Sequence, residues 1–301
     1  MSNPYMSNGN TNLLQSFVCY ADILGFSQMS LVRIHQGRGN EFLAFIRKSL
    51  NEAYENIRRE LLDNPEIDDF NLKVFTDNIV IGFPIKDISF DGGEPELGRL
   101  INMVSAYQMK LAMDGLFIRG AISFGYHYMD DDIVLGDALI EAHSLDNEGR
   151  PPRIVLAESM KAHIKEHFGY YSSPEVAPQF DELLLDSDNE IFLNYLDEAF
   201  SIFPDRDIFF ECLEGHKSAI EKNFEKYSNN LRVRQKYEWA ARYHNFVCRE
   251  MAEKYPLSND LDQGFEYKME SESANKTLDY LILDYEGEMP RRIDAHTLAN
   301  L

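Results

Sequence analysis

The fold is decided by the segment Phe17-Val-Cys-Tyr-Ala-Asp-Ile-Leu-Gly-Phe-Ser27. Its first eight residues form a short apolar run that ends at Gly25, and such a run predicts a buried strand. Asp22 interrupts this run. A carboxylate inside a buried strand is costly unless it is paired, hydrogen-bonded or bound to a metal. Asp22 is therefore the first candidate for a functional residue.

Beyond this strand, the spacing of apolar residues predicts alternating helices and strands. The predicted helices cover 40–62, 97–113 and 136–145. The predicted strands cover 70–75, 79–83, 116–124, 133–135 and 153–156. This order predicts an α/β (α+β) fold in which helices cover one face of a mixed sheet.

The chain divides into three expected regions. Residues 1–12 are rich in Ser, Asn and Gly and are expected to be a flexible N-terminal arm. The main α/β domain is expected over 13–160. Residues 161–301 are expected to form a mainly helical C-terminal extension packed on that domain, because helical patterns occur at 157–167 and 206–252.

Composition limits the class of protein. The 301 residues include 29 Lys and Arg against 51 Asp and Glu, so the net charge is −22. A surface this acidic repels phosphate and argues against a general nucleic-acid binder. The sequence has no apolar run of the roughly 20 residues that span a bilayer and no secretory signal pattern. Three widely spaced cysteines (Cys19, Cys212, Cys248) predict neither a disulfide framework nor a zinc site. We expect a cytoplasmic protein with no membrane or nucleic-acid partner.

A second carboxylate stands out by its location. Asp77 lies between the two apolar strands of the predicted hairpin, in the sequence Thr76-Asp77-Asn78. By spacing alone two readings remain open. Asp77 is either an ordinary turn residue, with Asp22 as a helix cap, or the two carboxylates act together.

Four short motifs in the same order resemble those of the class III nucleotidyl cyclases, the adenylate and guanylate cyclase family. They are the segment 17–27, Lys73-Val-Phe-Thr-Asp77, Arg119-Gly-Ala-Ile-Ser-Phe-Gly125 and Gly136-Asp-Ala-Leu-Ile-Glu-Ala142. The first segment, the hairpin tip and Lys236-Tyr-Glu-Trp-Ala-Ala-Arg-Tyr-His-Asn245 are most similar to the pyrimidine cyclases of the Pycsar anti-phage system. The resemblance extends over most of the chain and implies a class III cyclase-like fold, with its catalytic domain at 13–160.

The resemblance also implies an activity and a metal site. The activity is conversion of UTP or CTP to 3′,5′-cyclic UMP or CMP plus pyrophosphate. Two Mn²⁺ or Mg²⁺ ions would be held by the carboxylates of Asp22 and Asp77 and the backbone carbonyl of Ile23. Two-metal chemistry of this kind activates a hydroxyl and stabilises a leaving phosphate.

Further residues follow from the same resemblance. Arg119 is expected to act in catalysis and to bind the triphosphate, because a guanidinium is permanently charged and binds phosphate through two parallel hydrogen bonds. Phe26 and Lys73 are expected to contact the nucleotide, although a core position for Phe26 and an ion pair for Lys73 are equally open. The family forms homodimers with shared active sites, and its product signals phage infection to a separate effector protein.

One departure from the family keeps other functions open. In the class III cyclases, the closing helix carries an Asn and an Arg at the positions where this chain has Ile140 and Ser144. Either Arg119, Arg150 or Arg153 replaces that Arg, or the chain is a catalytically weak nucleotide sensor or scaffold. A purine cyclase is a further alternative. A dinucleotide cyclase is disfavoured because the hairpin tip has no glycine pair.

A zinc-like pattern lies outside these motifs. His163-Ile-Lys-Glu-His167 fits the H-x-x-E-H arrangement of some zinc peptidases. Because the surrounding segment is mostly polar, we expect a solvated helix face there. Asp132, in the acidic turn 130–132, is likewise expected to be solvated.

Overall fold

The fold is described from a computed structural model of the chain. It describes residues 3–7, 9–63, 70–86, 88–145, 150–197, 206–254, 280–285 and 287–301. Residues 255–279 of the expected C-terminal extension therefore lie outside the described ranges.

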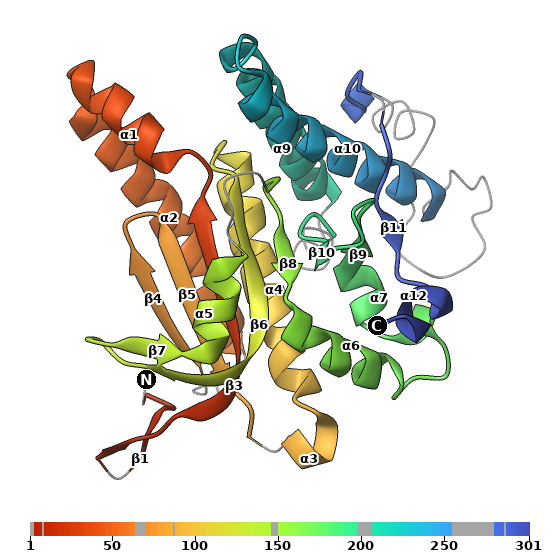
Figure 1. Cartoon of the computed structure of the whole chain (residues 1–301). Helices are drawn as coiled ribbons and strands as arrows, with labels where there is room; N and C mark the ends of the chain where they lie inside the picture. The colour runs from red at the N-terminus through yellow and green to blue at the C-terminus, as the bar shows by residue number, and fades with distance from the viewer. Residues whose placement is uncertain are drawn as a thin grey trace.

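A nine-stranded mixed sheet organises the molecule (Figure 1). Its central strand is β3 (Leu14–Ile23), which is antiparallel to β5 on one side and to β6 on the other. The parallel pair is β6 with β8, and this pair makes the sheet mixed. In spatial order the strands are β11 (Arg291–Arg292), β9 (Leu183–Leu185), β10 (Ile191–Leu193), β8 (Ile154–Leu156), β6 (Ile118–Met129), β3, β5 (Asn78–Pro84) and β4 (Asn71–Phe75), with β7 (Val134–Gly136) on β6.

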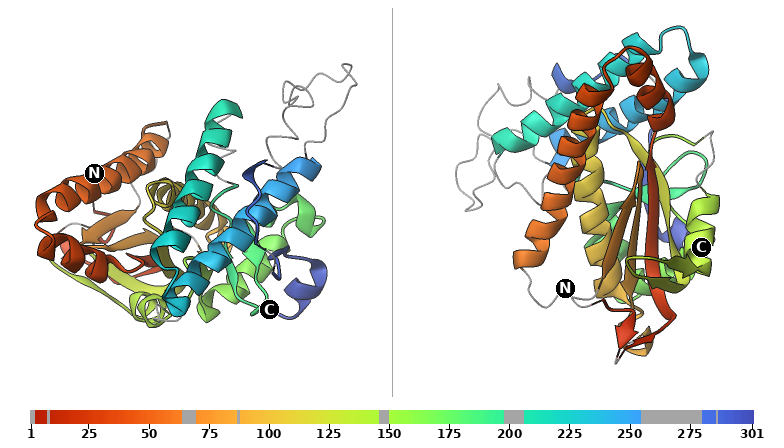
Figure 2. Two further views of the ribbon diagram at one scale, coloured as in Figure 1. Left: turned by 90° about the horizontal axis from the view of Figure 1, so that it is seen from above. Right: turned by 90° about the vertical axis from the view of Figure 1, so that its left-hand side faces the viewer.

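Helices cover both faces of the sheet, not one face as the sequence predicted. On one face, α2 (Gly39–Asp63) and α4 (Glu94–Met113) bury alternate residues of β3, among them Phe17 and Cys19. On the other face, α5 (Asp137–Ser144) packs on β3 and β6, where Val18 joins a cluster with Ala138 (Figure 2). The prediction was incomplete because Ser16, Tyr20 and Asp22 lie on the Val18 side of β3, and these polar residues did not indicate that α5 covers this face as well.

The C-terminal half extends this sheet. The helices α9 (Arg206–Lys226) and α10 (Leu231–Lys254) form an adjacent pair, and Trp239 of α10 packs with Phe192 of β10. The strands β9, β10 and β11 all lie beyond residue 160, so the sheet continues across the expected boundary. The helical pattern at 206–252 corresponds to two helices, separated by residues 227–230.

Within the expected N-terminal arm, residues 3–7 and 9–12 have a defined structure. A two-stranded sheet forms from β1 (Met6–Ser7) and β2 (Asn10–Thr11). Tyr5 is fully buried, and its hydroxyl donates to Ser16 Oγ at 3.2 Å. This burial of a large aromatic side chain holds the segment against the sheet.

Shorter elements connect these parts. One of them, α1 (Phe26–His35), follows β3 directly and has no fully buried residue. It lies at the same end of the sheet as the turn between α9 and α10 (Figure 1). The others are α3 (Ile88–Asp91), η1 (Glu158–Met160), α6 (Lys161–Phe168), η2 (Pro174–Val176), α7 (Gln179–Glu182) and α12 (Ala295–Ala299).

Candidate functional site

The fold brings the two candidate aspartates to the same end of the sheet. Asp22 is the penultimate residue of β3, and its partners across the sheet are Asn78 of β5 and Arg119 of β6. Asp77 lies in the two-residue turn between β4 and β5. The backbone N–H of Ile23 donates to the carbonyl oxygen of Asp77 at 3.2 Å. The backbones that carry both carboxylates are therefore hydrogen-bonded neighbours, although they are distant in sequence.

Arg119 forms an ion pair with Asp22. Its Nε lies 3.0 Å from Asp22 Oδ1, and its Nη2 lies 3.3 Å from Oδ2. The side chains are 12% and 17% exposed, respectively, so water screens the pair only in part. This fork geometry is the preferred one for an arginine and a carboxylate. It provides the partner that a carboxylate in a buried strand requires.

The turn that holds Asp77 has an unusual backbone. Thr76 has a φ of 54°, in the left-handed region that a β-branched residue rarely adopts. Its hydroxyl donates to Asp77 Oδ1 at 2.8 Å. The resembled motif has glycine at this position, which adopts such a φ without strain. The hydrogen bond links the strained residue directly to the candidate metal ligand.

The donors at this end of the sheet are suited to a hard divalent cation. Two carboxylates and the carbonyl of Ile23 are oxygen ligands, which Mg²⁺ and Mn²⁺ prefer. Within the described ranges, no group of three or more His, Cys, Asp or Glu side chains could hold a metal. Mg²⁺ commonly binds one or two carboxylates, with water and substrate phosphates as its remaining ligands. Asp22 and Asp77 fit that kind of site.

A cavity of about 360 Å³ lies beside the ion pair. Its first wall is the end of β3 and the start of α1, with Arg119 from β6. Its second wall is the turn between α9 and α10 and the first turns of α10. Lys236 and Tyr237 begin the segment 236–245 that carries part of the resemblance, but the sequence analysis assigned no site residue there. The lining residues are Leu24, Gly25, Gln28, Arg119, Tyr227, Asn230, Arg232, Val233, Lys236 and Tyr237. The volume is in the range of small-molecule sites, roughly 300–1,000 Å³.

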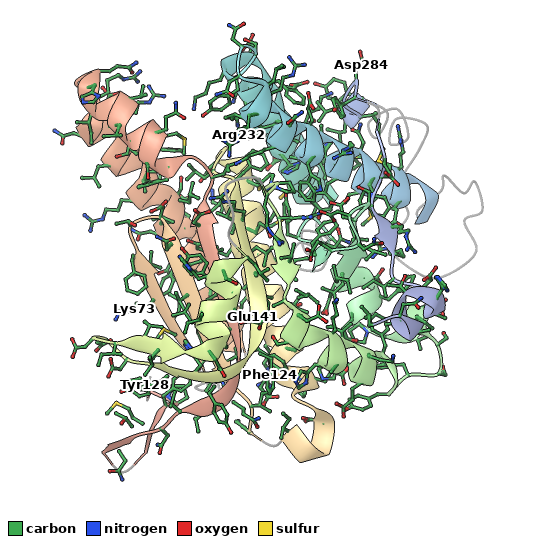
Figure 3. All side chains as sticks on the ribbon, in the orientation of Figure 1. Lys73, Phe124, Tyr128, Glu141, Arg232 and Asp284 are labelled. Carbon is green, nitrogen blue, oxygen red and sulfur yellow. The ribbon has the colours of Figure 1, made fainter. Side chains whose placement is uncertain are left out.

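Lys73 lies away from this cavity. It belongs to β4, and its ammonium donates to the carbonyl oxygens of Asp130 and Asp131 at 3.2 and 2.7 Å. Figure 3 shows Lys73 well separated from Arg232, which lines the cavity. Lys73 thus joins the acidic turn that precedes β7, as a cation bound to carbonyl groups. The exposed Asp132 lies in the same turn.

Phe26 is placed as a packing residue. Its ring lies 5.8 Å from that of Phe42 on α2, measured between centroids, and it packs against the core between α2 and the sheet. Phe26 is not among the residues that line the cavity. This placement favours the core position over contact with the nucleotide.

The candidate replacements for the missing arginine differ in their surroundings. Arg153 is buried and pairs with Asp186 and Asp188, and its guanidinium lies over the rings of Phe192 and Trp239. Such a cation is held inside the protein and cannot reach a ligand. Arg150 lies 3.6 Å from Glu190. Ile140 and Ser144 are exposed on α5. Of the three arginines, Arg119 is the one that lines the cavity.

The zinc-like pattern on α6 is a packing motif, and its expected solvation is wrong. His163 and His167 are both buried, and His163 packs against the rings of Phe17 and Phe124. Burial lowers the pKa of His163. Glu166 turns outward and accepts a hydrogen bond from Tyr170. The aromatic partners come from β3 and β6, which are distant in sequence, so the polar local sequence could not reveal this burial.

The chain matches no protein-family model, and a search of curated proteins finds no match. None of the described helices combines the length and apolarity needed to cross a membrane.

Proposed function

We propose that this chain is a pyrimidine nucleotidyl cyclase that converts UTP or CTP to 3′,5′-cyclic UMP or CMP and pyrophosphate. The observation that carries the proposal is the meeting of Asp22, Asp77 and Arg119 at one end of the sheet, beside the cavity. The element order supports it, since the four motifs that resemble class III cyclases fall on β3, on β4 and its turn, on β6 and on α5. The class III cyclase-like fold is part of this proposal.

The reaction requires one displacement at phosphorus. The ribose 3′-oxygen bonds to the α-phosphorus, the bond from that phosphorus to the bridging oxygen of pyrophosphate breaks, and the 3′-hydroxyl proton leaves to solvent. Divalent ions held by Asp22 and Asp77 would lower the pKa of the attacking hydroxyl and neutralise the triphosphate. The charge of the transition state falls on phosphate oxygens, where Arg119 is suited to donate two hydrogen bonds.

The turn between β3 and α1 supports phosphate binding. Gly25 has a φ of 74° and precedes the first turn of α1, where no side chain caps the helix. Backbone N–H groups at such a helix start are suited to bind phosphate. Gly25 also lines the cavity, and apart from its chain neighbours no atom of the described residues lies within 4 Å of the position that a Cβ would take there. The backbone is therefore accessible to a ligand.

The position of Lys73 supports a homodimer. Within one chain, Lys73 binds the acidic turn, does not line the cavity and lies well away from Arg232 of the cavity wall (Figure 3). In the resembled family, base contacts come from the partner subunit, so this separation is the one expected of a site completed by a second copy. Exposed apolar side chains on β6, β7 and α5 offer a surface for it; they are Tyr126, Leu135 and Ile140. The link to an effector in anti-phage defence rests on the resemblance alone.

A second candidate function is a nucleotide sensor without turnover. The ion pair of Asp22 with Arg119 favours it, because both carboxylate oxygens already accept hydrogen bonds. Ile140 and Ser144 favour it too, since neither side chain carries charge. A purine cyclase is the third alternative.

One experiment distinguishes these functions. The purified full-length protein is incubated with each of ATP, GTP, CTP and UTP and with Mn²⁺, and the products are identified by mass spectrometry. Cyclic UMP or CMP with pyrophosphate supports the proposal, cyclic AMP or GMP supports a purine cyclase, and binding without product supports the sensor. Asp22→Ala and Asp77→Ala should each abolish the product. Activity that persists in either folded variant would remove the metal assignment.

A further inference from the structure

The second wall of the cavity is built by the C-terminal half of the chain. Arg232 and Lys236 lie four residues apart on α10, so both project from the same face of the helix. Asn230 and Tyr227, from the turn before α10, complete this wall. Figure 3 shows Arg232 at the end of α10, above the sheet.

The charge of this wall is opposite to that of the whole protein. The chain carries a net charge of −22. Yet among the described residues that line the cavity, Arg119, Arg232 and Lys236 are cations and no side chain is a carboxylate. Cations gathered in a concave site focus a positive potential there. A cavity of this kind is suited to an anion that carries several charges.

The cations stand on a fixed support. Tyr237 follows Lys236 directly and is buried, with its ring stacked on that of Tyr227 at 5.7 Å and an interplanar angle of 7°. Its ring also meets Phe117 edge-on at 5.4 Å. These contacts fix the start of α10 against the sheet and the preceding turn. A preorganised wall loses less conformational entropy when it binds a ligand.

We propose that Arg232 and Lys236 bind the terminal phosphates of the nucleotide, with Arg119 on the opposite wall of the same cavity. The C-terminal half of the chain thereby supplies positive charge that α5 lacks, since Ile140 and Ser144 are uncharged. The identity of the nucleotide rests on the proposed function; the binding of a polyphosphate does not.

The direct test uses inorganic tripolyphosphate as the probe, in isothermal titration calorimetry without divalent metal. The full-length protein is compared with Arg232→Gln, Lys236→Gln and the control Arg234→Gln. Arg234 lies between them on the same helix, but it pairs with Glu238 at 3.3 Å and does not line the cavity. Each test variant should bind tripolyphosphate about ten-fold more weakly, which is a loss of about 1.4 kcal/mol. The control should bind like the wild type.

Either of two calorimetric results would overturn the inference. One is a wild-type protein that does not bind tripolyphosphate. The other is binding that Arg232→Gln and Lys236→Gln leave unchanged. Arg232 is exposed on the helix, so its replacement leaves the core intact, and thermal unfolding of each variant checks this.

The outcome is separable from that of the proposed function. If UTP or CTP is cyclised and both variants retain the wild-type KM, the inference fails and the proposed function stands. If no nucleotide is cyclised but tripolyphosphate binding depends on Arg232 and Lys236, the polyphosphate site stands and the proposed function fails. If both stand, KM for the nucleotide should rise about ten-fold in each variant.

Discussion

Arg119 binds both carboxylate oxygens of Asp22, at 3.0 and 3.3 Å, across adjacent strands of the sheet. The guanidinium thus occupies the oxygens that a divalent cation would need. If the proposed divalent cation binds Asp22, it would compete with Arg119 for these oxygens, and Arg119 would then be released toward the cavity that it lines. Under the proposed function, the pair would therefore couple metal binding to the presentation of a phosphate-binding group.

This competition predicts opposite effects of Arg119→Gln on metal binding and on turnover. Without the guanidinium, Mn²⁺ should bind about ten-fold more tightly, as electron paramagnetic resonance of free Mn²⁺ would show. Product formation should fall about 100-fold, because a donor to the transition-state charge is lost. Arg119→Lys keeps the positive charge but cannot form two parallel hydrogen bonds. Its Mn²⁺ affinity and its product formation should therefore lie between those of the wild type and those of Arg119→Gln. Weaker Mn²⁺ binding in Arg119→Gln would contradict the competition.

The backbone of Thr76 predicts a stabilising substitution. Thr76→Gly should raise the free energy of unfolding by about 1 kcal/mol, because glycine adopts a positive φ without the steric cost of a β-branched side chain. Asn189, at a φ of 65°, is the matched control. Asparagine tolerates this region, so Asn189→Gly should have little effect. Urea denaturation measures both; equal effects would show that Thr76 is not strained.

A site shared between two chains predicts complementation. Asp22→Ala and Lys73→Ala should each be inactive as homodimers. If the two are unfolded together and refolded as a mixture, heterodimers carry one intact site, and activity should return to about a quarter of the wild type. A mixture of Asp22→Ala with Asp77→Ala is the control. It should stay inactive, because both residues are expected in the same half-site. An active control mixture would contradict this arrangement.

The sequence predicted the central elements because their patterns are local. The buried strand around Asp22, the hairpin around Asp77 and the long helices α2 and α4 each show their periodicity within one segment. The pairing of β3 with β5 and β6 then brings Asp22, Asp77 and Arg119 to one end of the sheet. The resemblance indicated these three residues, but it did not predict that Arg119 forms an ion pair with Asp22.

The other parts of the fold and of the candidate site depend on contacts between segments that are distant in sequence. Nothing near Arg232 or Lys236 in the sequence indicates that the turn between α9 and α10 faces the end of β3. The strand β8 was predicted, but β9 to β11 are two or three residues long, too short for a clear alternation. His163 has polar sequence neighbours, and its burial is decided by Phe17 and Phe124.

The burial of Arg153 predicts a structural role for this cation. Arg153→Met should destabilise the fold by about 3–5 kcal/mol, because Asp186 would remain buried without its cationic partner. Asp186→Asn in the same chain should recover part of this loss. The control, Arg150→Met, removes the more exposed ion pair with Glu190. It should lower the free energy of unfolding by less than about 1 kcal/mol. Chemical denaturation measures all three. Lost activity at unchanged stability would instead make Arg153 functional.

The carboxyl group of Glu182 predicts a dependence of stability on pH. Burial, together with the nearby charges of Asp197, Glu94 and Asp181, raises its pKa to about 7. Among the described residues, its Oε2 has no hydrogen-bond partner. The folded chain therefore binds this proton more tightly than the unfolded chain, in which the pKa is 4.5. The neutral carboxyl group of Glu182 therefore contributes to the free energy of unfolding. This contribution is fully present below pH 4.5 and is lost as the pH rises to 7.

Glu182→Gln should remove this dependence, because glutamine fills the same space without a charge. At pH 8 the variant should exceed the wild type in free energy of unfolding by about 3 kcal/mol, and at pH 4 the two should differ little. The matched control is Glu175→Gln, on an exposed carboxylate whose pKa is lowered chiefly by a hydrogen bond from Ser173. It should show no gain at pH 8. If the difference between Glu182→Gln and the wild type were the same at both pH values, the pKa of Glu182 would be the same in the folded and unfolded chains, and its burial would carry no linkage to protons.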